Sequence, residues 1–452
     1  MLVNFRVDNF LSFNEISTFT MTLGKSKLHQ RNIIKRDPIN LLKFAALYGA
    51  NASGKSNFVD SIKFARKFIV DGIPNHPISG LYNRNHENNK YRDSSFEFEL
   101  VISGKIYSYG FSINLNEARV SKEWLYDITD SETEIFTRSN ELNINYDYMK
   151  FTEVDKNRLA VYAEDMLGDN NSLFLTVINK EKKALVSENG DRILNKLYDW
   201  FMNVLEVISP DDTTEEFGMT YHDEEYLNLL ANYLKNSDTG INKVILEETS
   251  ESLKGIPRVI EKSIRDKVRS DFEKSNKKHM RALMRTPESL YIFNNKDGEI
   301  TTSELKFIHG DNNIKYTFSE ESDGTIRLVE LFSVLNNLKE KVFVIDELDR
   351  SLHPLLTHDF IKKFLSSDAI DQLIISTHED RLLDLSLLRR DEIWFVSKDE
   401  SGDSSLYSLE EYKERFDKNI MNAYLDGRYG AIPDIVNKFP EILVKNRVME
   451  DD

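Results

Sequence analysis

The sequence predicts an α/β fold in which a mostly parallel sheet, interrupted by a long insertion, is joined to an antiparallel β subdomain. Three observations support this class. A short apolar run at 44–48 leads through a glycine-containing loop into an amphipathic helix. Later apolar runs alternate with helical segments, as parallel strands do. Apolar and polar residues alternate between 94 and 127, which is typical of an antiparallel meander.

Composition excludes several classes of protein. The chain has 452 residues, enough for roughly two to three domains. With no cysteine it has no disulfide, thiolate zinc site or iron–sulfur ligand, which fits a cytoplasmic protein. Its 59 basic and 76 acidic residues give a net charge of −17, which argues against an electrostatic grip on nucleic acid over the whole surface. No apolar run reaches the roughly 18 residues of a membrane span, and we expect neither a membrane segment nor a secretion signal.

The N-terminal elements follow the chain in order. Alternation at 2–7 and 10–13 predicts a strand, and 44–48 predicts a buried strand. From Phe58 to Ile69 apolar residues recur every three or four positions, which predicts a helix. The meander at 94–127 turns at Ser103 and Gly104. We expect residues 1–153 to form the first part of the α/β core.

The middle of the chain has helical periodicity, for example at 193–205 and 226–234. We therefore expect a helical insertion at 154–290. Strand-like runs return at 305–308, 341–345, 373–376 and 392–396, with helices between them, and we assign 291–452 to the second, parallel α/β part of the core. The two parts are expected to share one sheet.

Residues 49–56 match the phosphate-binding pattern G-x-x-x-x-G-K-[ST] between a strand and a helix, the context that this pattern requires. Its backbone N–H groups would surround phosphates, Lys55 would reach the β- and γ-phosphates, and the Ser56 hydroxyl would bind Mg²⁺. The predicted nucleotide-binding residues here are Gly49, Asn51, Ser53, Gly54, Lys55, Ser56 and Asn57.

The second motif is a pair of acidic residues that directly follows the strand predicted at 342–345. Asp346 is the predicted Mg²⁺ residue, and Glu347 is the predicted base that orients water. Taken alone, the pair could equally be solvated acids at a strand end. Ser322 and Gly324 precede Asp346, and His378 lies 31 residues after Glu347. Each of these also has a plain structural reading, as a turn or as a residue satisfied at a strand end.

This order of motifs resembles the ABC-type ATPase head of SMC, RecF and OLD proteins. The resemblance implies ATP and Mg²⁺ as cofactors and two heads that enclose two nucleotides. Ser322 and Gly324 would then contact the nucleotide of the partner, Asp349 would belong to the D-loop at the dimer seam, and His378 would be the switch histidine. The signature reads Ser-Asp-Gly rather than Ser-Gly-Gly, and no Q-loop glutamine is evident between Asp71 and Phe96.

The two ends of the chain resemble a narrower group. Residues 8–13 are similar to the NF-x-SF start of these heads, and 424–433 resemble a C-terminal block of bacterial AAA-labelled ATP-binding proteins, which include the ATPase component of PARIS and RloA-like proteins. That resemblance implies a homodimer or higher homo-oligomer that controls an effector in antiphage defence. The acids of an OLD-type Toprim domain are not evident, so a nuclease, Toprim-like or other, is expected on a partner.

Two other functions remain open. Residues 251–290 carry eleven basic and six acidic side chains, which fits either a DNA- or partner-binding face or a solvated helix. A DNA-binding face, including Lys277, Lys278 and Arg281, would suit an SMC- or RecF-like repair ATPase that acts directly on DNA. A scaffold that uses ATP only to hold its assembly together is the third possibility.

Overall fold

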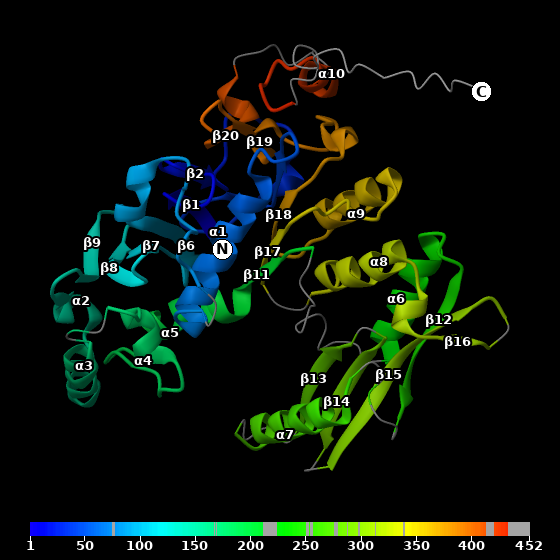
Figure 1. Ribbon diagram of the computed structural model, residues 1–452, viewed down its shortest axis with the longest axis horizontal. Coiled ribbons are helices and arrows are strands. Elements are labelled where there is room, and N and C mark those ends of the chain that lie inside the picture. Colours follow the sequence, from blue (N-terminus) through cyan, green and yellow to red (C-terminus); the bar gives the residue numbers. More distant parts are fainter. Residues whose placement is uncertain are drawn as a thin grey trace, which may run out of the picture.

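The computed structural model describes residues 1–74, 77–166, 168, 170–210, 224–249, 253, 256–274, 279–286, 288–296, 299–311, 313–337, 340–412 and 420–432. These residues form two sheets around one helix and a third sheet in a separate lobe. Figure 1 shows the lobe with the third sheet below the rest of the molecule.

A six-stranded sheet forms the centre of the fold and confirms that the two halves of the chain share one sheet. All of its neighbouring strands are parallel except the last pair. Because parallel strands end at the same edge, the loops that follow them gather there. The order is β11 (Leu205–Ile208), β17 (Val342–Ile345), β18 (Gln372–Ser376), β5 (Phe44–Tyr48), β19 (Ile393–Lys398) and β20 (Ser404–Ser408).

A seven-stranded antiparallel sheet confirms the predicted β subdomain. It contains the meander that the alternation at 94–127 predicts. The order is β10 (Leu142–Ile144), β9 (Thr133–Arg138), β8 (Arg119–Asp127), β7 (Lys105–Asn114), β6 (Ser94–Ile102), β1 (Leu2–Asp8) and β2 (Ser17–Thr20).

Helix α1 (Lys55–Asp71) packs between these two sheets. Its buried residues share one apolar core with strand residues of both sheets, such as Phe5 on one side and Leu47 on the other. Phe58 makes ring contacts with Phe5 and Phe19, with centroids 5.8 and 5.3 Å apart. A helix enclosed by two sheets is held rigidly, so the loop that precedes it is well positioned.

The opposite face of the six-stranded sheet is covered by α9 (Pro354–Ser366) and α10 (Ile420–Leu425). Successive residues of β5 point to opposite faces, so Ala45 and Leu47 lie with α1, whereas Phe44 and Ala46 lie with α9. Every residue of β5 is buried. A short pair, β3 (Ile33–Ile34) and β4 (Leu41–Leu42), lies beside this core.

The expected helical insertion at 154–290 is corrected by the structure, because this segment contains strands as well as helices. One of the strands, β11, is part of the central sheet. The strand pattern in this segment is short and lies between segments with helical periodicity, so the sequence did not reveal it. The elements described from 146 to 290 are α2 (Tyr146–Met149), α3 (Glu153–Asp165), α4 (Phe174–Asn179), α5 (Ile193–Asp199), the π-helical turn η3 (Trp200–Val204), β11, α6 (Glu224–Asn236), β12 (Ile241–Glu248), α7 (Arg258–Lys274), β13 (His279–Arg285) and the first residue of β14.

The third sheet is antiparallel, so the assignment of 305–308 to the parallel part is also corrected. Its order is β12, β15 (Glu299–His309), β14 (Leu290–Lys296) and β13, with β16 (Lys315–Tyr316) paired to β15. One face packs on α6 and α8 (Asp323–Leu335), through residues such as Phe307 and Phe332. The other face carries Tyr291 and Phe293, with α7 over it.

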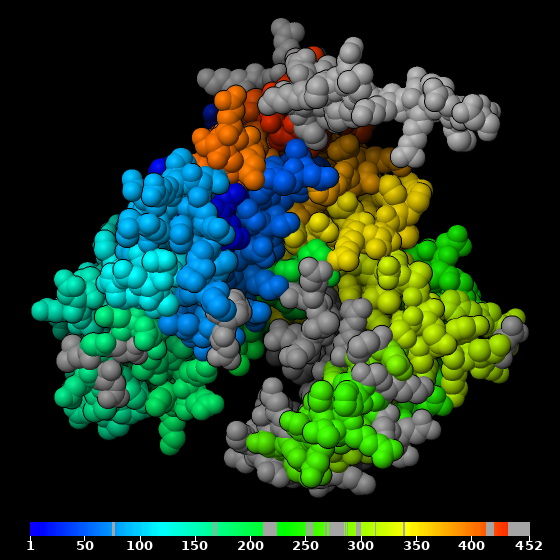
Figure 2. Space-filling model, viewed as in Figure 1, coloured from blue at the N-terminus to red at the C-terminus, as the bar shows by residue number. Residues whose placement is uncertain are grey.

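Helix α8 is the physical link between this lobe and the core. In the space-filling view the yellow-green α8 region continues into the yellow and gold α9 region without a break (Figure 2). Leu331 and Val334 of α8 belong to the core under the central sheet, whereas Leu328 and Phe332 belong to the core of the lobe. Among the described helices, none is long and apolar enough to cross a membrane.

Candidate functional site

The predicted phosphate-binding loop leaves β5 at the carboxyl edge of the central sheet and enters α1 at Lys55. Gly54 has φ +114°, a conformation that side chains rarely adopt. A Cβ there would lie 2.2 Å from Ser404 Oγ, so glycine is required for space as well. The amides of the first turn of α1 have no partner within the helix and are available to an anion.

The Lys55 side chain is buried against the loop that it follows. Its Nζ donates to the carbonyl oxygens of Gly49, at 2.8 Å, and Ala50, at 3.2 Å. Burial lowers the pKa of Lys55, while the charges of Asp346, Asp349 and Glu347 oppose that shift. Lys55 thus lies between the loop and the acidic residues, where the motif places a phosphate-binding ammonium.

A chain of three hydrogen bonds supports the loop from two distant parts of the sequence. Asn57 Nδ2 donates to Ser12 Oγ at 2.7 Å. The hydroxyls of Ser12 and Ser404 are 2.7 Å apart, and Ser404 Oγ donates to the carbonyl oxygen of Ser53 at 2.6 Å. No local pattern identified Ser404, because its partners are hundreds of residues away in the sequence.

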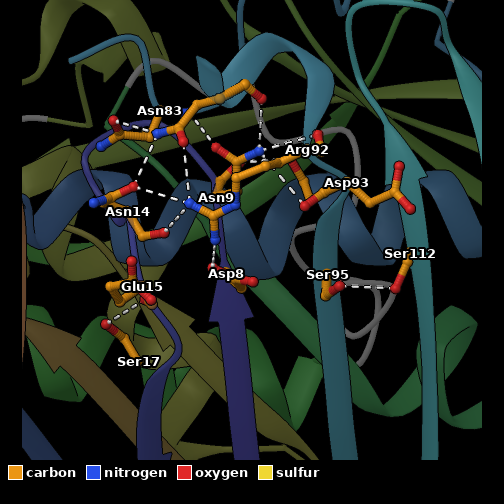
Figure 3. Close-up of polar contacts among 12 residues, drawn as sticks. Asp8, Asn9, Asn14, Glu15, Ser17, Asn83, Arg92, Asp93, Ser95 and Ser112 are labelled. Atoms are coloured by element: carbon orange, nitrogen blue, oxygen red, sulfur yellow. Dashed lines mark hydrogen bonds and ion pairs between the residues drawn. The ribbon is translucent and has the colours of Figure 1, made fainter. Parts of the chain in front are cut away.

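The loop that carries Ser12 is itself held by a polar network (Figure 3). Asn9 Nδ2 donates to the carbonyl oxygens of Asn89 and Arg92, and Asn9 Oδ1 accepts from the backbone N–H of Asn83 at 3.2 Å. Arg92 also pairs with Asp8 at 3.1 Å. The N-terminal motif at 8–13 is therefore a structural support for the phosphate-binding loop.

Asp346 and Glu347 directly follow β17, at the same edge of the sheet. Asp346 is buried, and Ser376 Oγ donates to its Oδ1. The N–H of Glu347 donates to the same Ser376 oxygen at 2.8 Å, and Glu347 has φ +47°, a strained value for this residue. Ser376 thus fixes both acids, and it was not among the predicted site residues.

Arg327 connects the signature helix α8 to this acidic corner. Its Nη2 donates to the carbonyl oxygen of Glu347 at 3.2 Å, and its Nη1 pairs with Glu330 at 3.1 Å. The side chain is buried. A shift of α8 would therefore also move the backbone of Glu347 through this hydrogen bond.

The signature residues begin α8. Ser322 is exposed and caps the helix by accepting from the N–H of Thr325 at 3.1 Å. A Cβ on Gly324 would lie 2.7 Å from the carbonyl oxygen of Ser351, so this glycine lets the signature approach the predicted D-loop. The carboxylate of Asp349 accepts from the N–H of His378 at 3.3 Å, which joins that loop to the predicted switch histidine.

One cleft of about 470 Å³ gathers most of the predicted residues. Six of the predicted residues are not part of its lining: Gly49, Ser53, Ser322, Gly324, Asp346 and Asp349. The residues that line it are Asn51, Ala52, Gly54, Lys55, Ser56, Asn57, Glu347, His378 and Lys398. Lys398, from the end of β19, was not predicted.

His378 is exposed on the protein surface at the rim of this cleft. Desolvation lowers its pKa, and the positive charge of Lys55 lowers it further, whereas Asp349 and Glu347 act in the opposite direction. The shift favours a neutral imidazole near pH 7, which can both donate and accept a hydrogen bond.

The residues predicted for Mg²⁺ fit that ion by their chemistry. Ser56 lines the cleft, and Ser376 Oγ donates to the carboxylate of Asp346 and orients it. Among the described residues, no group of three or more His, Asp or Glu side chains is arranged for a metal. Mg²⁺ commonly takes one or two protein ligands together with phosphates and water, which suits Ser56 and Asp346.

The C-terminal block packs under the phosphate-binding strand. Tyr424 and Tyr429 stack on Phe395, with centroids 5.6 and 5.0 Å apart, and Tyr424 contacts Tyr48 at 6.1 Å. This gives the block at 424–432 a structural role next to the site; Pro433 lies outside the described residues.

The basic segment at 251–290 is split between a helix and a strand. Arg265 of α7 pairs with Glu261 at 2.9 Å and donates to Thr302, so it supports the third sheet. Lys277 and Lys278 lie outside the described residues. Arg281 belongs to β13, so this part of the segment is not the helix that the sequence suggested, and direct DNA binding stays a prediction.

A comparison with protein families matches residues 44–384 to the family described as "AAA domain, putative AbiEii toxin, Type IV TA system". The match begins at β5 and includes the phosphate-binding loop, Ser322, Asp346 and His378. It therefore covers every segment that lines the cleft except β19, which carries Lys398.

Individual proteins of known sequence or structure are also similar to this chain. The chain is 23% identical over 400 residues to the "Retron Vc95 probable ATPase" of Vibrio cholerae serotype O1 biovar El Tor, covering 80% of this chain and 72% of that protein. Solved structures that align with it include an SMC head bound to the C-winged helix domain of ScpA, with a TM-score of 0.38, 15% identity and coverage of 91% and 98%. The SMC head domain from Thermotoga maritima aligns with a TM-score of 0.37 and 13% identity, covering 90% of this chain and 98% of that chain.

Proposed function

Because this chain belongs to the AAA-domain family with the AbiEii-type description, and is an ATPase of the AAA and ABC-like class, we propose that it binds and hydrolyses ATP with Mg²⁺ in the cleft around Lys55. The observation that carries the proposal is the convergence of Lys55, Ser56, Glu347 and His378 on one cleft. These residues lie at the start of α1 and in the segments that follow β17 and β18, at one edge of the central sheet.

Each residue has a distinct task in this proposal. Lys55 leaves the carbonyls of Gly49 and Ala50 and binds the β- and γ-phosphates, together with the amides of the first turn of α1. Glu347, held by Ser376, orients the attacking water. His378, neutral at pH 7, hydrogen-bonds near the terminal phosphate. Ser56 and Asp346 would hold Mg²⁺, which would neutralise part of the phosphate charge.

We further propose that the active form is a homodimer or a higher homo-oligomer. Ser322 and Gly324 begin an exposed helix end and do not line the cleft of their own chain, so a second copy is the way for them to reach a nucleotide. Gly324 packs closely against the backbone of Ser351, and the carboxylate of Asp349 accepts from the N–H of His378. The signature, the D-loop and the switch histidine are therefore in direct contact.

The proposed biological role is control of a partner effector in antiphage defence. It is supported by the descriptions of the family and the relative, a toxin-type family and a retron ATPase. An effector, Toprim-like or another nuclease, would be released or activated by a change in the ATPase assembly.

Molar mass measured by light scattering tests the assembly. We would compare wild type with Glu347→Gln, with and without Mg-ATP, because the variant should hold ATP without hydrolysing it. A mass that increases with ATP in the variant supports the composite site. The matched control is Lys55→Ala, whose mass should not respond because nucleotide binding is impaired. A monomer that persists with ATP bound would contradict the proposal.

A further inference from the structure

The β19–β20 hairpin brings a second cation to the nucleotide cleft. Lys398 is the last residue of β19 and lines the cleft with Asn51 and Lys55. Its side chain is exposed, and within the described part of the chain it has no ion-pair partner. Neither the phosphate-binding motif nor the other motifs of the site account for it.

The position of Lys398 is fixed relative to the phosphate-binding loop by pairing on both sides. Three residues before it, Phe395 pairs with Tyr48, the residue that precedes the loop. In the hairpin Lys398 lies directly opposite Ser404. Ser404 Oγ donates to the carbonyl oxygen of Ser53 at 2.6 Å, within the loop. Lys398 is thus the direct cross-strand partner of a residue that is hydrogen-bonded to the loop.

The turn of the hairpin is also held in place. Asp403 accepts from Asn83 at 2.9 Å, from Asn85 at 2.7 Å and from His86 at 2.7 Å. Partial burial raises the pKa of Asp403, but these three hydrogen bonds outweigh it and the pKa falls below its ordinary value. Asp403 is therefore ionised at neutral pH and keeps its three donors, so the hairpin presents Lys398 from a rigid support.

The charge of the cleft indicates what Lys398 binds. The side chains that line it include two lysines and one carboxylate, Glu347, and the amides of the α1 N-terminus add positive character. A nucleoside triphosphate has about four negative charges, more than Lys55 and one Mg²⁺ neutralise. An exposed ammonium held beside the loop suits a phosphate oxygen.

We propose that Lys398 is an additional nucleotide-binding residue, which pairs with the phosphate chain of the nucleotide in the cleft. This inference rests on the proposed function, because it takes the nucleotide as the occupant.

Titration calorimetry with Mg-ATP, Mg-ADP and AMP on Lys398→Gln, Lys398→Arg and wild type tests the proposal. We expect Lys398→Gln to bind ATP about fivefold to tenfold more weakly, as expected for one lost charge-assisted contact at a solvent-exposed site. Lys398→Arg should stay within about twofold of wild type, since the charge is kept. The salt dependence of ATP binding should also weaken in Lys398→Gln, which a purely structural role would not change.

Lys122→Gln, an exposed lysine on β8, is the control for a loss of charge far from the cleft. A loss limited to ATP places Lys398 at the terminal phosphate, and an equal loss for ATP and ADP places it at the inner phosphates. Unchanged ATP affinity in Lys398→Gln, with wild type binding and Lys55→Ala impaired, would overturn this inference alone. If wild type itself bound no nucleotide, the proposed function would fail instead.

Discussion

At the residue scale, Glu347 is the side chain on which hydrolysis should depend most. Its backbone is fixed by Ser376 and Arg327, and its side chain lines the cleft. Glu347→Gln should reduce the ATPase rate about 100-fold or more, because the amide cannot accept a proton, while the dissociation constant for ATP stays near that of wild type. Steady-state turnover together with equilibrium binding measures both quantities.

The control for this prediction is Glu379→Gln. Glu379 is next to His378 in the sequence, but its carboxylate accepts from the N–H of Arg381 at 3.1 Å. This variant should retain most of its activity. A Glu347→Gln protein that hydrolyses ATP as fast as Glu379→Gln would remove Glu347 from the proposed mechanism.

A second prediction at this scale concerns a buried acid away from the cleft. Glu392 is fully buried, and its Oε1 has no hydrogen-bond partner in the described structure. Burial raises its pKa well above 4.5, although the Arg389 N–H and the Asn32 side chain, at 2.7 and 2.9 Å, partly oppose the shift. A raised pKa stabilises the fold fully below the unfolded value of 4.5, and this stabilisation is lost as the pH rises toward the folded pKa.

Glu392→Gln removes this titration. Relative to wild type, the variant should therefore become more stable as the pH is raised from 4.5 to 8, and urea unfolding at the two pH values measures the difference. Glu400→Gln, at an exposed position, is the control and should follow wild type. A Glu392→Gln difference that is the same at both pH values would contradict the prediction.

At the scale of elements, the contact between the hairpin and the phosphate-binding loop can be tested at Gly54. Gly54→Ala should reduce the free energy of unfolding by about 2 kcal/mol and weaken ATP binding, because φ is +114° and the new Cβ meets Ser404 Oγ at 2.2 Å. Adding Ser404→Gly removes the closest clash, although Ser12 Oγ remains at 2.8 Å. The double variant should therefore be more stable than the sum of the two single effects predicts. Additive effects in chemical denaturation would mean that the two elements are not in contact.

The elements also show what the sequence could predict and what it could not. The strand, loop and helix around Lys55 are contiguous, so local periodicity and spacing were sufficient to identify them. Ser12 and Ser404 were not recognised as supports of the loop, because a hydrogen bond between residues 392 positions apart leaves no local pattern. Residues 305–308 were assigned to the parallel part because an apolar strand looks alike in either orientation; only the pairing of β15 with β12 and β14 shows that it is antiparallel.

At the scale of the whole molecule, the question is whether a site is completed by a second chain. Arg327 and the Gly324–Ser351 contact make α8 part of the corner around Glu347, yet Ser322 is exposed and lies outside the lining of the cleft. The third sheet packs on the same helix, so a second chain that contacts Ser322 would also affect the lobe. In this arrangement, contact of a second chain with the start of α8 would change the position of Glu347 in the cleft.

Mixing two inactive variants tests this arrangement directly. Lys55→Ala removes the phosphate-binding side of a site, and Ser322→Arg blocks the surface offered to the partner. Each alone should be inactive if sites are shared. In a mixed dimer, one site combines the intact Lys55 of one chain with the intact Ser322 of the other, so an equimolar mixture should recover roughly a quarter of wild-type turnover. Differently tagged chains, purified in series, confirm that mixed dimers form. These dimers could stay inactive even though Ser322→Arg binds ATP and only Lys55→Ala is impaired in binding it. In that case Ser322 does not act on the nucleotide of the partner chain, and the exposed end of α8 makes a different contact.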